Sequence, residues 1–286
     1  FFSATPHASM VKAFAIAGIG RSKYVKVDTL PDSEAMDVVD LEKRLLASNA
    51  AGKVVVASAG TVTGTDFDDL ETIADLCEKH KAWLHVDGAF GLFTRLIPER
   101  QHWTKGIERA DSITSDGHKW LNVPYDSGIF LTRHIKILQQ VCSVAAPYLD
   151  LGNDMPDFMD RGIENSRRFR ALPVWMALKA YGYEGHRAIV EHNCEMASLL
   201  ADFLENDPRF ELLHPCNLNV VVFRLQGDET GERTARLLNA INKDGRVFLT
   251  PGQWKGKKAI RAAFSNWRIL KEDVIDICNL LEEKFM

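Results

Sequence analysis

The sequence predicts an α/β protein in two parts, with a mainly parallel sheet in residues 1–172 and a small α+β domain in residues 173–286. Short apolar runs such as Val54-Val55-Val56 alternate with segments whose apolar residues recur at helical spacing, which is typical of a parallel sheet covered by helices on both faces. The apolar fraction is 46% and the charged fraction 26%, so this chain of 286 residues can bury a sizeable core.

The elements of the first part follow from this alternation. After a strand at residues 53–58, a helix begins at Asp68 or Asp69, whose side chain caps it, and ends near residues 79–81, where cations suit the helix dipole. The pattern predicts further strands at residues 82–87, 112–115 and 128–132. Ligands of open α/β sheets bind beyond the carboxyl ends of such strands.

The pattern changes near Pro173, where the small domain is expected to begin. Two helices are predicted first, and strands then alternate with two more helices. The predicted helices cover residues 175–181, 186–205, 232–243 and 272–285, and the strands cover residues 219–224, 246–250 and 259–264.

Composition excludes several classes of protein. A net charge of -4 without a dense basic run argues against nucleic acid as a partner. The longest apolar stretch near the start, residues 13–20, is too short to span a bilayer and no charged leader precedes it, so no membrane association is expected. The five cysteines are odd in number and scattered, which favours free thiols and a cytoplasmic location over a disulfide framework or a metal site.

Two motifs at strand ends carry the chemistry. Asp87 ends the motif His85-Val86-Asp87, and Lys119 lies in Ser115-Asp116-Gly117-His118-Lys119-Trp120. A lysine amine can condense with the aldehyde of pyridoxal phosphate, and a carboxylate can keep the pyridine ring of that cofactor protonated. Each residue taken alone also fits a plainer interpretation, a solvated lysine and a strand-end cap. Together they point to pyridoxal phosphate chemistry.

At these motifs the chain resembles the group II pyridoxal-dependent amino acid decarboxylases, of the aromatic-L-amino-acid and glutamate type. The resemblance extends to residues 6–13, 57–68, 85–91 and 166–175, and it implies the large and small domains of the type I fold of aspartate aminotransferase. It covers nearly the whole chain, which begins without methionine, but only about the last three fifths of a family member. We therefore expect a piece of a longer protein or a reduced relative, with the phosphate-binding and substrate-carboxylate residues upstream of Phe1.

The resemblance implies a role for each site residue. Lys119 holds the cofactor as a Schiff base, and Asp87 pairs with its ring nitrogen. His7 stacks on one face of the ring and Ala89 packs on the other, while His118 lies against the cofactor. His7 by itself also fits a surface residue at a helix start.

Two further residues belong to this set. Thr61 or the neighbouring Thr63 is a candidate donor to the phenolic oxygen or phosphate of the cofactor, and the alternative is an ordinary turn at residues 60–65 after a strand. Tyr148 matches in position the loop tyrosine that protonates the substrate carbon after carbon dioxide leaves, and a loop-anchoring role is the alternative. Arg167, Arg168 and Arg170 fit either carboxylate binding or structural ion pairs.

Other functions are less well supported by the sequence. A hydrolase lacks a Gly-x-Ser-x-Gly elbow, residues 18–23 lack the third glycine of a dinucleotide site, and a metal site of His85, Asp87 and His118 has no supporting signature. We expect decarboxylation of an L-amino acid, with an aromatic one favoured, by a homodimer. The open alternatives are transamination, aldehyde synthesis or carbon-sulfur lysis on the same scaffold, and a non-catalytic dimerising relative or fragment.

Overall fold

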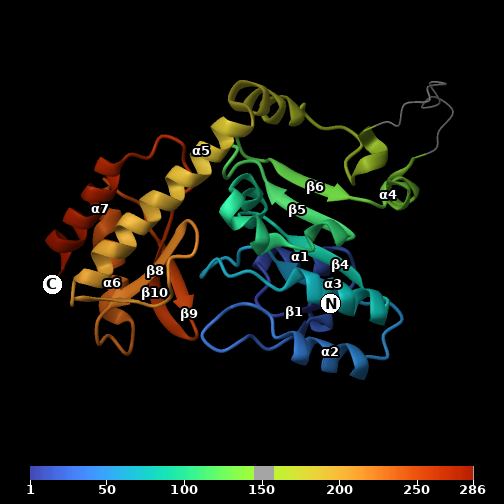
Figure 1. Cartoon of the computed structure of the whole chain (residues 1–286), viewed down its shortest axis with the longest axis horizontal. Helices are drawn as coiled ribbons and strands as arrows, with labels where there is room; N and C mark the ends of the chain where they lie inside the picture. Colours follow the sequence, from blue (N-terminus) through green and yellow to red (C-terminus); the bar gives the residue numbers. More distant parts are fainter. Residues whose placement is uncertain (145–157, 286) are drawn as a thin grey trace.

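The computed structural model describes residues 1–144 and 158–285, and its first sheet has the strand order β2-β1-β3-β4-β5-β6 (Figure 1). Neighbouring strands from β2 to β5 are parallel, and β6 is antiparallel to β5. The bounds are β1 Phe2–Ser3, β2 Val25–Lys26, β3 Val54–Ser58, β4 Trp83–Asp87, β5 Ser112–Asp116 and β6 Gly128–Thr132. The predicted mainly parallel sheet is therefore confirmed.

Four α-helices accompany this sheet: α1 Ala8–Ile16, α2 Val38–Ala47, α3 Leu70–His80 and α4 Ile135–Cys142. Helices α2 and α3 bury their apolar sides with β1, β3 and β4 in one core that includes Leu41, Leu45, Ile73 and Val86. The connections contain short 3-10 helices, η1 Arg21–Lys23, η2 Gly91–Leu96, η3 Pro98–Thr104, η4 Ile107–Arg109 and η5 Phe158–Arg161. The sequence patterns had not indicated the elements before residue 50.

The start of α3 resolves the choice between two candidate caps. Asp69 is the N-cap, because its carboxylate accepts the backbone N–H of Thr72 at 3.1 Å. Asp68 is buried instead and accepts the backbone N–H groups of Ser58 and Met36 at 2.7 and 2.6 Å. It thus joins the end of β3 to the loop before α2.

Helix α5, Ala171–Asn206, runs from the first sheet to the second with a kink at Gly182, whose φ and ψ are 62° and -167°. The two helices predicted for this segment are its two halves. Pro173 lies in the first turn, where its missing N–H leaves no hydrogen bond unmade. Val190 packs with Phe90 in the first part, whereas Leu200 belongs to the core of the second, so a boundary after residue 172 stays a proposal.

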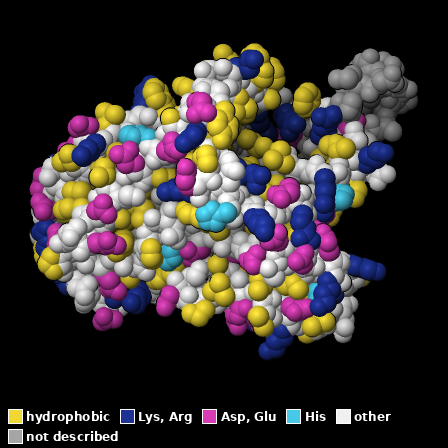
Figure 2. Space-filling view, in the orientation of Figure 1, with side chains coloured by type: hydrophobic (Ala, Val, Ile, Leu, Met, Phe, Trp, Pro, Cys, Tyr) yellow, Lys and Arg dark blue, Asp and Glu magenta, His cyan; other side chains and the backbone are white. Residues whose placement is uncertain are grey.

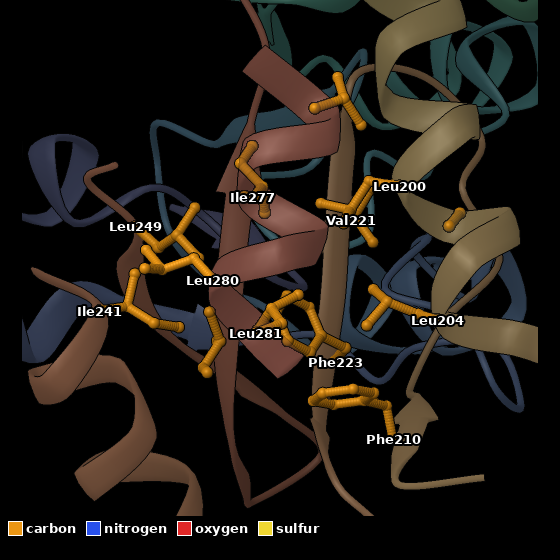
Figure 3. Packing of buried hydrophobic residues seen from close by; sticks show 14 of the residues in the cluster. Leu200, Leu204, Phe210, Val221, Phe223, Ile241, Leu249, Ile277, Leu280 and Leu281 are labelled. Carbon is orange, nitrogen blue, oxygen red and sulfur yellow. The ribbon is translucent and has the colours of Figure 1, made fainter. Parts of the chain in front are cut away.

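The second part is an antiparallel sheet of order β7-β8-β10-β9 with two helices beside α5. Figure 3 shows Leu200 and Leu204 of α5, Val221 and Phe223 of β8, and Leu280 and Leu281 of α7 converging into one core. The bounds are β7 Phe210–Leu212, β8 Val220–Leu225, α6 Glu232–Asp244, β9 Thr250–Trp254, β10 Lys257–Ala263 and α7 Lys271–Lys284. The predicted small α+β unit is present.

One predicted strand was wrong. Residues 246–250 were expected to form it, but β9 begins only at Thr250. The reason is a side chain: Asn242 accepts the backbone N–H of Leu249 and donates to its carbonyl, both at 2.9 Å. These groups are then unavailable to a neighbouring strand.

Of the helices described, none is long and apolar enough to cross a bilayer.

Candidate active site

A cavity of about 600 Å³ lies at the carboxyl ends of β3, β4 and β5. It is lined by six of the seven predicted site residues, which come from separate segments: His7, Thr61, Asp87, Ala89, His118 and Lys119. The seventh, Tyr148, lies outside the described residues. A parallel sheet brings the ends of adjacent strands to one edge, and this explains how distant segments of the sequence meet here.

Lys119 occupies the turn that follows β5. Its Nζ lies 2.9 Å from Asp116 Oδ2 and 4.3 Å from the centre of the Phe90 ring. The next residue, Trp120, is buried, and its Nε1 donates to Asn193 Oδ1 of α5 at 2.9 Å. The lysine turn is therefore anchored to the long helix, and this anchor holds the amine at the cavity wall.

Asp87 is the last residue of β4 and is half-buried at the cavity. Its Oδ1 accepts the backbone N–H of Ala89 at 3.1 Å. Oδ2 makes no hydrogen bond to any residue in the described ranges, so this oxygen can accept a hydrogen bond from a bound molecule. Ala89 lines the same cavity with a methyl group, which suits packing against a flat ring.

The two histidines lie at different places on the wall. His7 is the N-cap of α1, where its Nδ1 accepts the N–H of Ser9 at 3.3 Å, and the exposed side chain is at the cavity lining. The His118 ring stacks on Tyr125, with centroids 4.2 Å apart and an angle of 26°. His118 Nδ1 also lies 3.3 Å from the carbonyl of Ser127, which fixes the ring plane beside Lys119.

Thr61 is already engaged by protein groups. Its hydroxyl donates to Glu34 Oε2 at 2.6 Å and accepts the backbone N–H of Asp66 at 3.0 Å. Glu34 Oε2 also accepts the N–H of Gly64 at 2.7 Å. These bonds hold the loop after β3 in place, so the hydrogen of the Thr61 hydroxyl is committed to Glu34 in this structure.

His85 lies below Asp87 on the same face of β4, as strand alternation requires. Its Nδ1 is 2.8 Å from Ser112 Oγ and its Nε2 is 3.3 Å from Thr114 Oγ1, so hydroxyls occupy both ring nitrogens. Burial lowers the pKa of His85, while the charge of Asp87 acts in the opposite direction. A neutral imidazole with both nitrogens engaged does not suit the metal site considered above.

A second hydrogen-bond group joins this region to the small domain. Asp66 accepts from Ser33 Oγ at 2.8 Å and from the N–H of Glu34 at 2.7 Å. From the other domain, His214 Nε2 lies 3.1 Å from Asp66 Oδ1 and Asn217 Nδ2 donates to the same oxygen at 3.0 Å. The loop that bounds the cavity is therefore tied to both parts of the chain.

A larger cavity of about 830 Å³ adjoins the first and shares Ser115, Gly128 and Ile129 with it. It is lined by apolar side chains of α5 and by the three arginines named above. Arg168 bonds to Asp126 and to the carbonyl of Tyr125, and Arg170 forms an ion pair with Glu164 at 2.7 Å. Figure 2 shows basic and apolar side chains close together along the upper edge of the molecule.

Sequence patterns had not identified Glu34 or Tyr125 as parts of this site. Glu34 and Tyr125 carry no local signal, because each acts through a partner that only folding brings near. Strand alternation had already predicted that His85 shares the face of Asp87, although His85 was considered there only as a metal ligand.

Comparison with known proteins agrees with this geometry. A family model described as the pyridoxal-dependent decarboxylase conserved domain matches residues 1–226. The chain belongs to the pyridoxal-dependent decarboxylase family. The resemblance found at the lysine and aspartate motifs is thereby confirmed.

Two curated members of the family illustrate the relationship. Histidine decarboxylase of Drosophila melanogaster is 35% identical over 94% of this chain and 32% of its own length. Aromatic-L-amino-acid decarboxylase of Bacillus atrophaeus is 31% identical over 97% of this chain and 60% of its own length. This chain therefore spans less than two thirds of either relative.

Solved structures give the same fold. The Oryza sativa TDC structure with PLP and tryptamine superposes with a TM-score of 0.93 at 25% identity, over 99% of this chain and 62% of that one. Mouse CSAD in apo form superposes with a TM-score of 0.89 at 24% identity, over 100% of this chain and 63% of that one. The pyridoxal phosphate-dependent type I fold predicted from the motifs is confirmed.

Pyridoxal phosphate is the cofactor of this family, and the residues present fit it. The cavity offers a primary amine at Lys119, a carboxylate oxygen of Asp87 that has no partner among the described residues, and a histidine ring at His7. An aldehyde, a ring nitrogen and a ring face are the features of the cofactor that these groups suit.

Proposed function

We propose that the chain carries the lysine and aspartate of a decarboxylase that acts on an L-amino acid. The observation that supports this most strongly is that Asp87, at the end of β4, and Lys119, in the turn after β5, line one cavity of about 600 Å³. Bound pyridoxal phosphate supplies an aldehyde for an amine and a ring that accepts the electrons released when a carboxylate leaves. The protein must hold that ring, keep it charged and exclude competing reactions.

Each residue then has a definite task. Lys119 would hold the aldehyde of the cofactor through its amine. Asp87 holds a proton on the ring nitrogen through Oδ2, because a carboxylate next to a cation favours the charged form of both. His7 covers one ring face and excludes water, and Ala89 packs on the other. His118, oriented by Tyr125, borders the cofactor beside the lysine.

Two further residues have specific proposed roles. We propose that Tyr148 returns a proton to the α-carbon after carbon dioxide leaves. Thr61 donates its hydroxyl hydrogen to Glu34 and accepts from Asp66, so we propose that it contacts the cofactor by packing rather than as the donor expected from the sequence. Both proposals carry over from the family resemblance.

An aromatic side chain is the substrate feature that we favour. Phe90 and Phe130 lie in the cavity lining, and flat rings gain from stacking on such side chains. The two curated relatives described above are named as decarboxylases of histidine and of aromatic L-amino acids. Transamination, aldehyde synthesis or carbon-sulfur lysis would use the same lysine, so the products must be identified directly.

We also propose that the protein is a cytoplasmic homodimer. All five cysteines are free thiols, which suits a reducing compartment. Several large apolar side chains near α4 and the start of α5 are at least half exposed, including Val141, Ile163 and Trp175. A second copy would cover such a surface. Sedimentation at several concentrations tests this, and a single species of monomer mass throughout would contradict it.

Reconstitution with pyridoxal phosphate tests the function. The wild-type chain should gain a visible absorption band, and Lys119→Ala should lose it. Lys179→Ala is the matched control, because that lysine is exposed and lies outside the cavity. With aromatic amino acids, the products expected are carbon dioxide and the amine without ammonia. An unchanged band in Lys119→Ala, or ammonia as the main product, would contradict the proposal.

A further inference from the structure

Asn193 of α5 connects the lysine turn, residues 117–122, to the small domain. Its Oδ1 accepts from Trp120 Nε1 at 2.9 Å, and its Nδ2 donates to the backbone carbonyl of Asn266 at 3.0 Å. Asn193 and Trp120 are 0% and 1% exposed, so solvent does not compete for these bonds. Asn266 lies between β10 and α7 in residues 264–270, which we call the small-domain loop.

The chemistry of the two partners fixes the orientation of the Asn193 amide. An indole N–H only donates and a backbone carbonyl only accepts, so Oδ1 must face Trp120 and Nδ2 must face Asn266. A carboxylate in this place would lack the donor, and an aliphatic side chain would lack both groups. The amide therefore matches the lysine turn on one side and the small-domain loop on the other.

Asn122 makes a second connection to the same loop, three residues after Lys119. Its Nδ2 donates to the carbonyl of Trp120 at 3.0 Å, and its Oδ1 accepts the backbone N–H of Trp267 at 3.2 Å. The backbone N–H of Asn122 bonds to the carbonyl of Lys119 at 3.0 Å, and its φ is 51°. The small-domain loop is thus bonded to the lysine turn both directly and through α5.

The Trp120 indole is linked to the amine in two ways. Trp120 directly follows Lys119 in the chain. Its ring also packs edge-on against Phe90, with centroids 5.5 Å apart and an angle of 72°, and Lys119 Nζ lies 4.3 Å from the centre of the Phe90 ring. A displaced indole would therefore move both the backbone that carries the lysine and the ring against which its amine lies.

We propose that Asn193 and Asn122 are positioning residues through which the small-domain loop sets the place of the Lys119 amine. Without Asn193, the Trp120 N–H would be buried without an acceptor, and the indole would move to recover one. A group misplaced by about 1 Å can lose on the order of 100-fold in reactivity. The inference rests on the proposed function, since it concerns the amine that would meet the cofactor aldehyde. None of the described residues after 172 lines the cavity, so the small domain acts on it only through such contacts.

The anchor is tested without cofactor, by hydrogen exchange of the indole N–H groups in the ¹⁵N-labelled full chain. The Trp120 signal is identified as the one lost in Trp120→Phe. We expect it to exchange slowly, unlike that of Trp175, which is 59% exposed. Asn193→Ala should exchange it about tenfold faster or more. A Trp120 signal that exchanges as fast as Trp175 in the wild-type chain, or equally slowly in Asn193→Ala, would overturn the proposal.

The effect on the amine is tested by equilibrium dialysis with two ligands, pyridoxal phosphate and its deoxy analogue, in which a methyl group replaces the aldehyde. Only the first can condense with Lys119. Asn193→Ala should reduce the preference for pyridoxal phosphate about tenfold or more. Asn122→Gly, which tolerates the left-handed backbone, should reduce it about threefold or more.

Asn219→Ala is the matched control. Asn219 is also 0% exposed and donates to a small-domain carbonyl, that of Phe264, at 2.7 Å. It makes no hydrogen bond to the lysine turn within the described ranges. This variant should lose stability in urea and keep the wild-type preference between the two ligands.

The outcomes separate this proposal from the proposed function. If Lys119→Ala keeps the wild-type preference, or the wild-type chain shows no preference, the amine proposed for the function is wrong and the role of both asparagines fails with it. If Lys119→Ala abolishes the preference but a folded Asn193→Ala or Asn122→Gly keeps it, only the positioning proposal fails. Equal weakening of both ligands in these variants counts as an unchanged preference and marks a merely structural role.

Discussion

His214 Nε2 of the small domain lies 3.1 Å from Asp66 Oδ1 of the large domain, and both side chains are buried. Burial disfavours both charges. The hydrogen bonds and charges around each group together outweigh burial, so the pKa of Asp66 is lowered by His214, Glu34 and Ser33, and the pKa of His214 is raised chiefly by Asp66. Because Asp66 also holds the loop at Glu34, this pair links the small domain to the cavity.

The pair predicts a pH dependence of stability. The contribution of His214 is complete below its unfolded pKa of 6.5 and is lost as the pH rises through its raised pKa. The contribution of Asp66 is present above its unfolded value of 3.8 and is lost as the pH falls through its lowered pKa. His214→Gln should therefore cost about 1–3 kcal/mol near pH 6, and less near pH 9.

Urea unfolding of wild type and His214→Gln over this pH range measures the effect. His102→Gln, at an exposed histidine, should change neither the stability nor its pH dependence. A loss in His214→Gln that is equal at both ends of the range would show that the charge of His214 does not contribute.

Gly117 predicts a steric effect on the lysine turn. A Cβ at this position would lie 2.4 Å from Ser127 Oγ and 3.2 Å from Val123 Cγ2. Gly117→Ala should therefore shift the turn that holds Lys119 and weaken pyridoxal phosphate about tenfold or more, since overpacking costs about 1–3 kcal/mol. Removing the Ser127 hydroxyl in Gly117→Ala/Ser127→Ala should recover part of the affinity.

Gly52→Ala is the matched control, because nothing lies within 4 Å of its Cβ. The affinity is measured by absorption titration. Wild-type affinity in Gly117→Ala would mean that the turn accommodates the extra methyl group and that its close packing is not needed.

Two substitutions of Thr61 test whether this residue stabilises the loop after β3 or contacts the cofactor. Thr61→Val removes the bond to Glu34 and leaves the N–H of Asp66 without its acceptor, which should cost about 1–3 kcal/mol of unfolding free energy. Thr61→Ser keeps both bonds and should match the wild type. Urea unfolding and cofactor titration are compared. Weaker binding in Thr61→Val at unchanged stability would instead support direct contact with the cofactor.

The core of the small domain predicts a large packing effect. Phe223 is fully buried among Leu204, Phe210 and Leu281 (Figure 3). Phe223→Ala should cost about 3–5 kcal/mol, because the cavity it leaves cannot close completely. Phe248→Ala is the control, since that side chain is 78% exposed, and it should change the unfolding free energy by less than about 0.5 kcal/mol. Similar losses in both variants would contradict the core assignment.

Local patterns were sufficient for much of the fold. Strands β3, β4, β5 and β6 were predicted within one residue at each end, because their apolar runs and flanking turns are features of adjacent residues. Strands β1 and β2 were not predicted, because two residues are too few to show the alternation that identifies a strand. The strand predicted at residues 246–250 was wrong. The composition of these residues favours a strand, but the Asn242 side chain occupies the backbone N–H and carbonyl of Leu249 that a strand partner would need.

The sequence by itself determined which reactive groups the protein carries near its strand ends, because the amine of a lysine and the carboxylate of an aspartate are present in any surroundings. Only the tertiary structure decided how they are held. Trp120 anchors the lysine turn to Asn193, and His85 reaches Thr114, through bonds between residues far apart in the chain. Such bonds depend on three-dimensional proximity, which no local spacing of residues encodes.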